Sequence, residues 1–321
     1  MQSSIKLVVC IASTALFDCS ESHEIWKRDG VEAYTNHQRE NVNKPLQPGV
    51  GFPLVQSLLK LNEVVDNPII DIVLVSRNDG GSVKRIINSI NYYKLSITRT
   101  SFTCGEEVTK YLPSWECDLF LSTEEEQVRE VLTGGSSNSL QDTTFNSSSW
   151  SKDQVRIVFD GDGVLFLEEP QPINFEQCDH QMEQSLLAKG PIQAFALKLQ
   201  NVRQALGEDN KWRIRTFLVT SNTDANAIRV IQALEEMGLD LNETHILNGL
   251  DKTPFLRVID PAISFYHSND NVGSSSEFIP SVHVPCSRQT SRASISDIVL
   301  ISSNQDTKPS TFNDNYSEEE N

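Results

Sequence analysis

Basic residues are scarce in this chain of 321 residues, in which 27 Lys and Arg stand against 44 Asp and Glu. The formal net charge is −17 at pH 7. Surfaces that coat DNA or RNA, or that bind anionic lipid, carry an excess of positive charge. We therefore expect no nucleic-acid partner and no membrane partner. Any phosphate group that the protein handles must be met by a local site.

Cysteine motifs and long apolar runs are also missing. The six cysteines form no CxxC pair and no Cys/His cluster, so neither a zinc site nor a dense disulfide framework is indicated. No run approaches the roughly 20 apolar residues of a membrane-spanning helix. Residues 6–17 have the length of a signal-peptide core, but no small-residue cleavage site follows them. We interpret this segment as a buried strand and expect a cytoplasmic protein.

Apolar runs alternate with helical patterns along most of the chain. Several of the runs are continuous in Val, Ile, Leu and Phe, which is typical of parallel strands covered by helices on both faces. Strands are predicted at 6–17, 69–75, 118–122, 155–159, 213–219, 262–266 and 281–284. Helices are predicted at 50–65, 82–93, 124–132, 190–207 and 224–238. This alternation predicts an α/β fold.

Parts of the chain repeat at an offset of 144 residues (Ile70 to Ile214) or 142 residues (Asp18 to Asp160). From Ile70 and from Ile214, the sequence passes through a strand, a small polar turn and a helix. The matching positions are Ile70 with Ile214, Asp118 with Ala262, Phe17-Asp18 with Phe159-Asp160, and Lys110 with Lys252. We therefore predict two tandemly duplicated Rossmann-like halves with parallel sheets covered by helices.

Composition sets the predicted boundaries. Residues 1–130 form an N-terminal α/β half and residues 153–285 a second half, joined by a Ser/Thr/Asn/Gly-rich linker at 131–152. Residues 286–321 are predicted to be a disordered polar tail. Within that tail, residues 294–303 are an apolar island for which an edge strand or a short binding segment is the alternative to mobility.

The sharpest local signal is the run VRIVFDGDGVLF. In it a buried strand leads directly into Asp160-Gly161-Asp162-Gly163. Ligands of parallel α/β sheets bind outside the carboxyl ends of the strands, so both carboxylates are expected in that crevice. The alternative is an acidic turn in which the two glycines permit a sharp bend.

Two further elements favour chemistry at that edge. Thr220 ends another buried strand, and Lys252 precedes a helix. An aspartate nucleophile, a second aspartate, a hydroxyl and a lysine are the parts of phosphoryl transfer through an aspartyl-phosphate. Asp160 would attack phosphorus, and Asp162 would act as acid and then base. Thr220 and Lys252 would hold the phosphoryl oxygens; taken singly, each is otherwise a helix cap or a solvated lysine.

At these residues the chain resembles the haloacid-dehalogenase-like phosphohydrolase superfamily and, more closely, the cytosolic 5'-nucleotidase type I family. The resemblance covers residues 6 to about 285. It rests on ALFD, GVEAYTNHQRENVNKPLQPGVGFPLVQSLLKLN, RIINSINYYKL, DLFLSTEEEQVREVL, FDGDGVLF, KGPIQAFALKLQ, TFLVTSN, LNGLDKTPFLRVIDP and SVHVP. It implies Mg²⁺-dependent hydrolysis of nucleoside 5'-monophosphates, with AMP favoured, to nucleoside and phosphate.

The resemblance also implies roles for single residues. Gly161, Ser221 and Asn222 would bind the substrate, and Asp160 and Asp162 would hold Mg²⁺, with Asp270 as a substitute ligand if the turn before it rearranges. The first half resembles the family's non-catalytic half. Its Asp18, Ser76 and Lys110 are interpreted as vestiges or as a nucleotide-sensing surface, and a nucleotide activator and a homo-oligomer are left open.

The chain departs from the family pattern in two places. Where the family has paired aspartates, this chain has Tyr266-His267, and neither side chain is a natural replacement for a Mg²⁺ carboxylate. Asp270 is the nearest carboxylate, and His267 suits a softer divalent metal or is simply a polar strand end. Where the family continues with Ala-Arg after the threonine, this chain has Ser221-Asn222. The alternative function is therefore a catalytically impaired nucleotide-binding paralogue.

Overall fold

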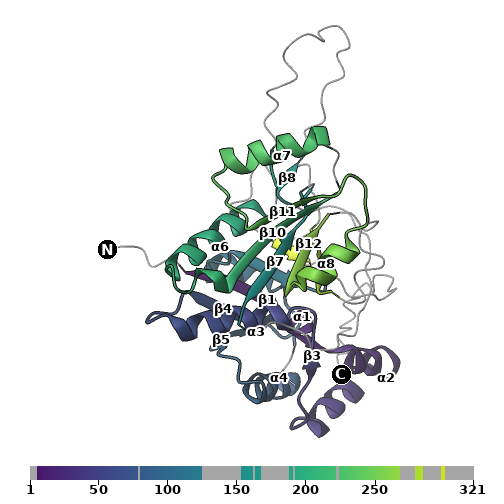
Figure 1. The fold of residues 1–321 in the computed structure, drawn as a ribbon. Helices are drawn as coiled ribbons and strands as arrows, with labels where there is room; N and C mark the ends of the chain where they lie inside the picture. Colours follow the sequence, from purple (N-terminus) through teal and green to yellow (C-terminus); the bar gives the residue numbers. More distant parts are fainter. Residues whose placement is uncertain are drawn as a thin grey trace, which may run out of the picture.

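The structure is a computed structural model. It describes residues 6–78, 80–124, 153–161, 163–167, 188–190, 192–221, 224–267, 279–284 and 298–300. Two five-stranded sheets dominate it, and all neighbouring strands within each of them are parallel (Figure 1). Helices flank both sheets, so the predicted α/β fold of Rossmann-like halves is confirmed.

The first sheet has the strand order β14-β6-β1-β4-β5. Its strands are β1 (Leu7–Ala12), β4 (Ile70–Ser76), β5 (Arg99–Phe102), β6 (Leu119–Ser122) and β14 (Ile298–Leu300). Every residue of β1, β4 and β6 is buried. Continuous burial explains why these strands are apolar throughout rather than alternating. The helices of this half are α1 (Ser13–Leu16), α2 (Ser20–Glu40), α3 (Phe52–Lys60) and α4 (Gly80–Tyr92).

The second sheet has the strand order β11-β10-β7-β12-β13. Its strands are β7 (Val155–Phe159), β10 (Ile214–Thr220), β11 (Glu243–Ile246), β12 (Ile263–Tyr266) and β13 (Ser281–His283). Its helices are α6 (Gln193–Ala205), α7 (Asp224–Glu236) and α8 (Thr253–Ile259). Two short antiparallel pairs complete the strands: β2 (Phe17–Asp18) with β3 (Gln47–Pro48), and β8 (Phe166–Leu167) with β9 (Ala188–Lys189).

Several predicted elements need correction. The expected strand over 6–17 ends at Ala12, because the chain then forms the single helical turn of α1. Helix α2 was not predicted, since it is polar and buries only Ser22 and Gln38. Strands β5 and β11 were also missed. Both lie at sheet edges and are only partly buried, so they lack a continuous apolar run.

The apolar island of the predicted tail provides one strand of the first sheet. Ile298–Leu300 form β14, which pairs in parallel with β6. The expectation of disorder is therefore wrong for these three residues, and the edge-strand alternative holds for them. The rest of 286–321, the linker at 131–152 and the predicted helix 124–132 beyond Glu124 lie outside the described residues. The boundaries between the halves stay predictions.

The two sheets share their register as well as their strand order. Ile70 of β4 lies opposite Leu7 of β1, and Ile214 of β10 lies opposite Val155 of β7. The offset of 144 residues holds for β4 and β10, for β5 and β11, and for β6 and β12. This agreement is what the predicted internal duplication would produce.

The first strands of the two halves follow a different offset. Leu7 corresponds to Val155, so Ala12 is the counterpart of Asp160. The neighbouring pairs agree, since Val9 lies opposite Leu119 as Ile157 lies opposite Ile263. The predicted equivalence of Asp18 with Asp160 is therefore wrong. The chain turns through α1 before it reaches Asp18, and so moves this carboxylate away from the strand end.

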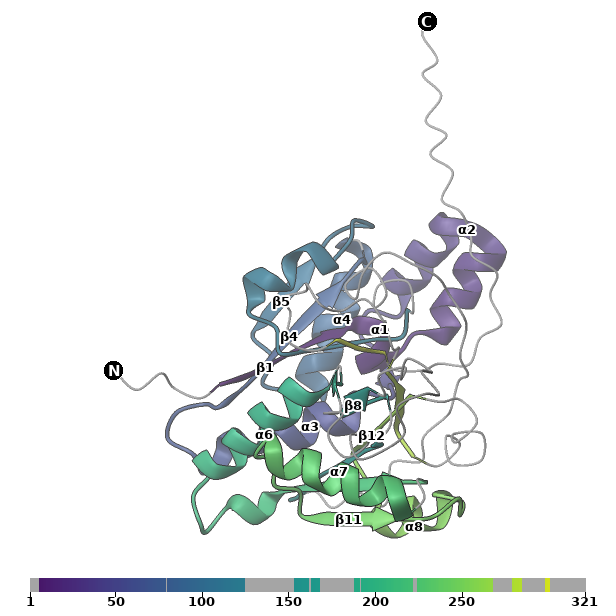
Figure 2. The ribbon, with the colours of Figure 1, turned by 90° about the horizontal axis from the view of Figure 1, so that it is seen from above.

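Helices α3 and α6 join the two halves. Helix α3 contacts β7 of the second sheet, and α6 contacts β1 of the first. Figure 2 shows both helices between the first-half strands β1, β4 and β5 and the second-half elements β11 and α8. Apolar side chains of both halves form one continuous core, and Lys198 of α6 pairs with Asp118 at 2.5 Å. No helix within the described ranges combines the length and apolar character needed to cross a membrane.

Candidate active site

The carboxyl edge of the second sheet brings together three predicted catalytic residues. Asp160 follows the last residue of β7, and its backbone N–H donates to Phe265 O of β12 at 2.9 Å. Thr220 is the last residue of β10 and is fully buried. Gly161 lies between them, because a Cβ added to it would stand 3.3 Å from Thr220 Oγ1. Parallel strands thus place the carboxylate and the hydroxyl at one edge, as expected.

Lys252 completes this cluster through a buried ion pair. Its Nζ lies 2.7 Å from Asp160 Oδ2, and each side chain is only 8% exposed. Removing one member of such a pair leaves the other as an uncompensated buried charge. The two residues are therefore coupled in stability as well as in position.

The loop before α8 places Lys252 at the edge. Leu247 N donates to Thr220 O, and Gly249 N donates to Ser221 O, each at 2.9 Å, so the loop follows the end of β10. The Asp251 carboxylate accepts hydrogen bonds from the backbone N–H and the hydroxyl of Thr253, at 2.9 and 2.8 Å. These two bonds lower the pKa of Asp251 and stabilise the first turn of α8. Ser221, a predicted substrate ligand, lies directly beside this loop. Asp162, Asn222 and Asp270 fall outside the described residues.

His267 is the main feature of this edge that residue spacing does not predict. It follows β12, and its ring lies against Gly163 so closely that a Cβ at Gly163 would overlap it. Gly163 has a φ of +70°, a conformation that favours glycine. The His267 ring stacks on that of His283, with centroids 6.1 Å apart. The strand-end imidazole therefore packs on the loop that carries Asp160.

The residues described at this edge do not fit the Mg²⁺ centre that the resemblance implies. Mg²⁺ demands near-octahedral oxygen ligation. Within the described ranges, no group of three or more His, Cys, Asp or Glu residues could hold a metal. The Oδ2 atom of Asp160 binds Lys252, and the end of β12 presents Tyr266 and His267 rather than carboxylates. We therefore derive no reaction step through Mg²⁺.

The carboxyl edge of the first sheet has a different chemistry. Ala12 stands where the second half has Asp160, and Ser76 stands where it has Thr220. The hydroxyls of Ser13 and Ser76 lie 2.9 Å apart. Asp18 instead accepts hydrogen bonds from Ser20 N and Oγ at the start of α2. Lys110 pairs with Glu106 on the exposed surface at 3.0 Å. The predicted vestigial residues thus have local structural contacts.

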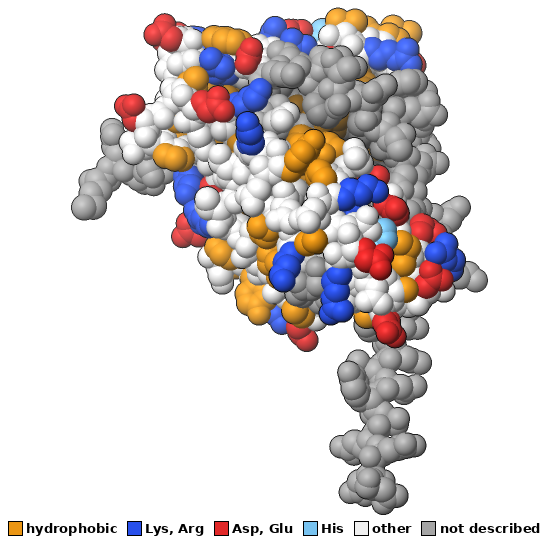
Figure 3. Space-filling view, turned by 90° about the horizontal axis from the view of Figure 1, so that it is seen from below, with side chains coloured by type: hydrophobic (Ala, Val, Ile, Leu, Met, Phe, Trp, Pro, Cys, Tyr) orange, Lys and Arg blue, Asp and Glu red, His pale blue; other side chains and the backbone are white. Residues whose placement is uncertain are grey.

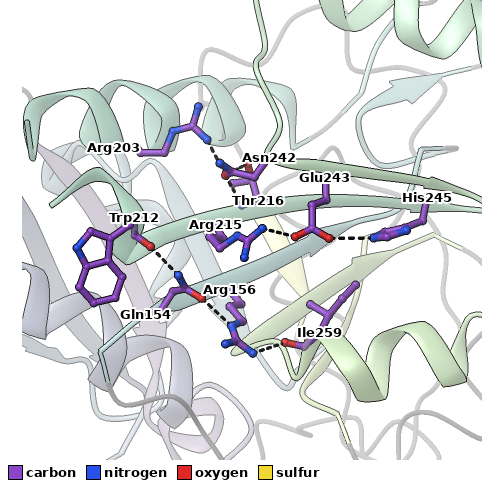
Figure 4. A network of polar contacts seen from close by, with 10 residues as sticks. All are labelled: Gln154, Arg156, Arg203, Trp212, Arg215, Thr216, Asn242, Glu243, His245 and Ile259. Atoms are coloured by element: carbon purple, nitrogen blue, oxygen red, sulfur yellow. Dashed lines mark hydrogen bonds and ion pairs between the residues drawn. The ribbon is translucent and has the colours of Figure 1, made fainter. Parts of the chain in front are cut away.

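Polar contacts at the opposite, amino edge of the second sheet are structural (Figure 4). Arg203 donates to Asn242, whose Oδ1 also accepts the backbone N–H of Thr216 at 2.9 Å. Nearby, Glu243 binds both Arg215 and His245. Arg215, Thr216 and Asn242 lie near the amino edge, where the network holds loops together, whereas His245 lies opposite Val219 near the carboxyl end of β10.

Two parallel sheets define an α/β protein, and a buried acid, hydroxyl and lysine gather at the carboxyl edge of the second sheet, where proteins of this class bind ligands. The sequence profile of the 5'-nucleotidase family matches residues 1–291. The chain belongs to the 5'-nucleotidase family, which confirms the predicted resemblance.

A curated relative is human cytosolic 5'-nucleotidase 1B. It is 30% identical to this chain over 276 residues, which cover 81% of this chain and 45% of the relative. The chain therefore spans less than half the length of this relative. No solved structure matches the chain significantly.

Proposed function

We propose that the chain is a 5'-nucleotidase that hydrolyses nucleoside 5'-monophosphates, AMP above others, to nucleoside and phosphate. Membership of the 5'-nucleotidase family supports the reaction class. The observation that carries the assignment of the site is the buried ion pair between Asp160 and Lys252, 2.7 Å apart beside Thr220. A cytoplasmic location is proposed with it, since the human relative is named as cytosolic.

Asp160 is the proposed nucleophile. One of its carboxylate oxygens forms a bond to phosphorus, while the bond from phosphorus to the 5'-oxygen of the nucleoside breaks. Asp162 would give a proton to that leaving oxygen. It would then take a proton from the water that opens the aspartyl-phosphate and releases phosphate. This role for Asp162 comes from its place two residues after Asp160 in the sequence.

Lys252 and Thr220 would stabilise the transferring phosphoryl group. The ammonium of Lys252 already lies against the nucleophile, so it meets the negative charge brought by the phosphate. The Thr220 hydroxyl lies beside Gly161 and would donate to a phosphoryl oxygen. Both side chains are buried, and hydrogen bonds and charges act more strongly in such an environment than in water. Ser221 and Asn222 would complete the substrate contacts.

The alternative is a nucleotide-binding paralogue that has lost catalysis. The observation that favours it is the strand end at Tyr266 and His267, which supplies no carboxylate. Both proteins would bind a nucleoside monophosphate, but only the enzyme would turn it over. A nucleotide activator and a homo-oligomer remain predictions from the resemblance.

An assay of phosphate release from AMP, IMP and CMP distinguishes the enzyme from the nucleotide-binding paralogue. We expect the purified chain to release phosphate and Asp160→Asn to release it at least about 10³-fold more slowly, because the amide is not a nucleophile. Asp209→Asn is the matched control, since Asp209 is exposed and precedes the amino end of β10, opposite to the end that carries Thr220. A folded wild-type chain that binds AMP but releases no phosphate with Mg²⁺, Mn²⁺ or Co²⁺ would establish the paralogue instead.

A further inference from the structure

The backbone that carries Lys252 is held from its amino-terminal side by the end of β10. Leu247 N donates to Thr220 O, and Gly249 N donates to Ser221 O, each at 2.9 Å. These bonds bring the loop to the carboxyl edge of the sheet. They end at Gly249, before Lys252, so the direction of the lysine side chain depends on the residues that follow.

From its carboxyl-terminal side, Lys252 is held by the first turn of α8. Lys252 has helical backbone angles, with φ −74° and ψ −23°, and its carbonyl accepts a hydrogen bond from Leu256 N at 3.0 Å. Lys252 is therefore already part of the helical turn, and Asp251 stands in the position of its N-terminal cap. The Asp251 carboxylate fills that role, because it accepts hydrogen bonds from Thr253 N and Thr253 Oγ1 at 2.9 and 2.8 Å.

The same kind of cap occurs at the start of α2 in the first half. There the Asp18 carboxylate accepts hydrogen bonds from Ser20 N and Ser20 Oγ. In both caps an acid bonds to the backbone and the hydroxyl of the second residue after it. The residue between the two is Cys19 in the first half and Lys252 in the second. Of these two caps, the one on α8 therefore fixes a buried ammonium group.

We infer that Asp251 is a positioning residue, whose cap on α8 holds the Lys252 ammonium against Asp160. The inference rests on the proposed function and deepens it, since Lys252 is the proposed partner of the phosphoryl group. Asp251 is exposed and bonds to Thr253, so it acts through the backbone and not by contact with the substrate. Its effect is expected to be large for a surface residue, because a displacement of about 1 Å at a reacting group can cost about 10²-fold in rate.

The first test is steady-state phosphate release from AMP by the full chain with Asp251→Ala, well below the unfolding temperature. We expect kcat to fall by about 10- to 100-fold, because Lys252 is no longer held in place. A cap with only a structural role would lower the unfolding midpoint and leave kcat of the folded chain unchanged. If Asp251→Ala does not fold, Asp251→Gly replaces it, since glycine is tolerated at an N-terminal cap.

Two further variants separate capping from charge and from stability. Asp251→Asn keeps a side-chain oxygen for Thr253, so kcat should stay within about threefold of the wild type. Asp18→Ala is the matched control, because it removes the same pair of hydrogen bonds from α2. It should lower the unfolding midpoint without changing kcat. A loss with Asp251→Asn as large as that with Asp251→Ala would overturn the inference, since charge and not capping would then be at work.

The second test needs no activity. The urea midpoint shift caused by Asp251→Ala is measured in the wild type and in the Asp160→Asn/Lys252→Met background. If the cap holds the ion pair together, the shift should be larger in the wild type, where both the pair and the first turn of α8 are weakened. Equal shifts in the two backgrounds would overturn the inference, as would a folded Asp251→Ala variant with the kcat of the wild type.

The two proposals fail in different ways. A wild-type chain that releases no phosphate would sink the 5'-nucleotidase, and the urea comparison would then decide the role of Asp251 alone. Phosphate release that is lost with Asp160→Asn but unchanged with Asp251→Ala would do the reverse.

Discussion

The two halves of the molecule place different side chains on equivalent strand ends. Both sheets have the same strand order and register, yet Ala12 in the first half corresponds to Asp160 in the second. In both halves the residue after one strand, β6 or β12, contacts the segment that follows the central strand, β1 or β7. In the first half this contact joins Thr123 to Thr14 through a 2.6 Å hydrogen bond, and in the second it packs His267 on Gly163.

The comparison shows that a few side chains, and not the shared strand arrangement, set the chemistry of each carboxyl edge. At the first edge the buried hydroxyls of Ser13 and Ser76 bond to one another. From α2, Tyr34 accepts a hydrogen bond from Ser82 at 2.8 Å and donates one to Asn78 at 3.3 Å, above the same strand ends. The second edge instead has a buried carboxylate and ammonium. One strand arrangement can therefore support buried hydroxyls beneath an exposed ion pair of Arg77 with Glu124, or a buried charged site, depending on a few residues.

The largest expected effect comes from breaking the charged pair of the second edge. Lys252→Met should lower phosphate release by about 10³-fold and the free energy of unfolding by about 3–5 kcal/mol, because it leaves Asp160 buried without a counter-ion. Steady-state kinetics and urea unfolding measure both. The double variant Asp160→Asn/Lys252→Met should be more stable than Lys252→Met alone. Equal stability of Lys252→Met and wild type would contradict the coupling.

Adding a carboxylate to the carboxyl edge of the first sheet tests the comparison in the opposite direction. Ala12→Asp puts a carboxylate where Asp160 stands in the second half, but none of the lysines described in the first half is buried, and Arg77 at the end of β4 already pairs with Glu124. We expect a loss of about 3–5 kcal/mol in urea unfolding and no recovery of activity in an Asp160→Asn background. Ala12→Ser is the control and should cost less, since a hydroxyl carries no charge. Recovered phosphate release would show that edge position alone suffices.

A smaller effect on stability is expected where the His267 ring packs on the loop that contains Gly163. Gly163→Ala should destabilise the chain by about 1–3 kcal/mol, because alanine is strained at a positive φ and its Cβ overlaps the imidazole. Adding His267→Ala should restore part of the lost stability, since it removes the overlap but not the backbone strain. Thermal and urea unfolding measure the two variants side by side. No recovery in the double variant would mean that the ring does not press on Gly163.

The smallest effect is expected at the lysine of the first half. Lys110→Ala should leave phosphate release and the unfolding midpoint within experimental error, because the contacts of Lys110 with Glu106 and with the Tyr111 ring are on the surface. Acidic and basic side chains are interspersed over the face of the molecule in Figure 3. Lys252→Met, by contrast, should lower both phosphate release and stability. A clear change in phosphate release would revive the reading of Lys110 as part of a nucleotide-sensing surface.

Residue patterns alone predict much of this site. Asp160, Thr220 and Lys252 were each expected at the carboxyl edge because each ends a buried strand or begins a helix. Residue patterns did not predict α2 or the edge strands β5 and β11. A polar helix and a half-buried strand bury too few side chains to leave a clear apolar period.

The sequence by itself determined the α/β class, because the apolar runs of β1, β4, β7, β10 and β12 are continuous and must be covered on both faces. Only the tertiary structure decided that Ala12, and not Asp18, is the counterpart of Asp160. Hydrogen bonds between strands set that equivalence, and the turn of α1 changes the spacing along the chain without disturbing them. The contact of His267 with Gly163 likewise depends on two segments about a hundred residues apart meeting at one sheet edge.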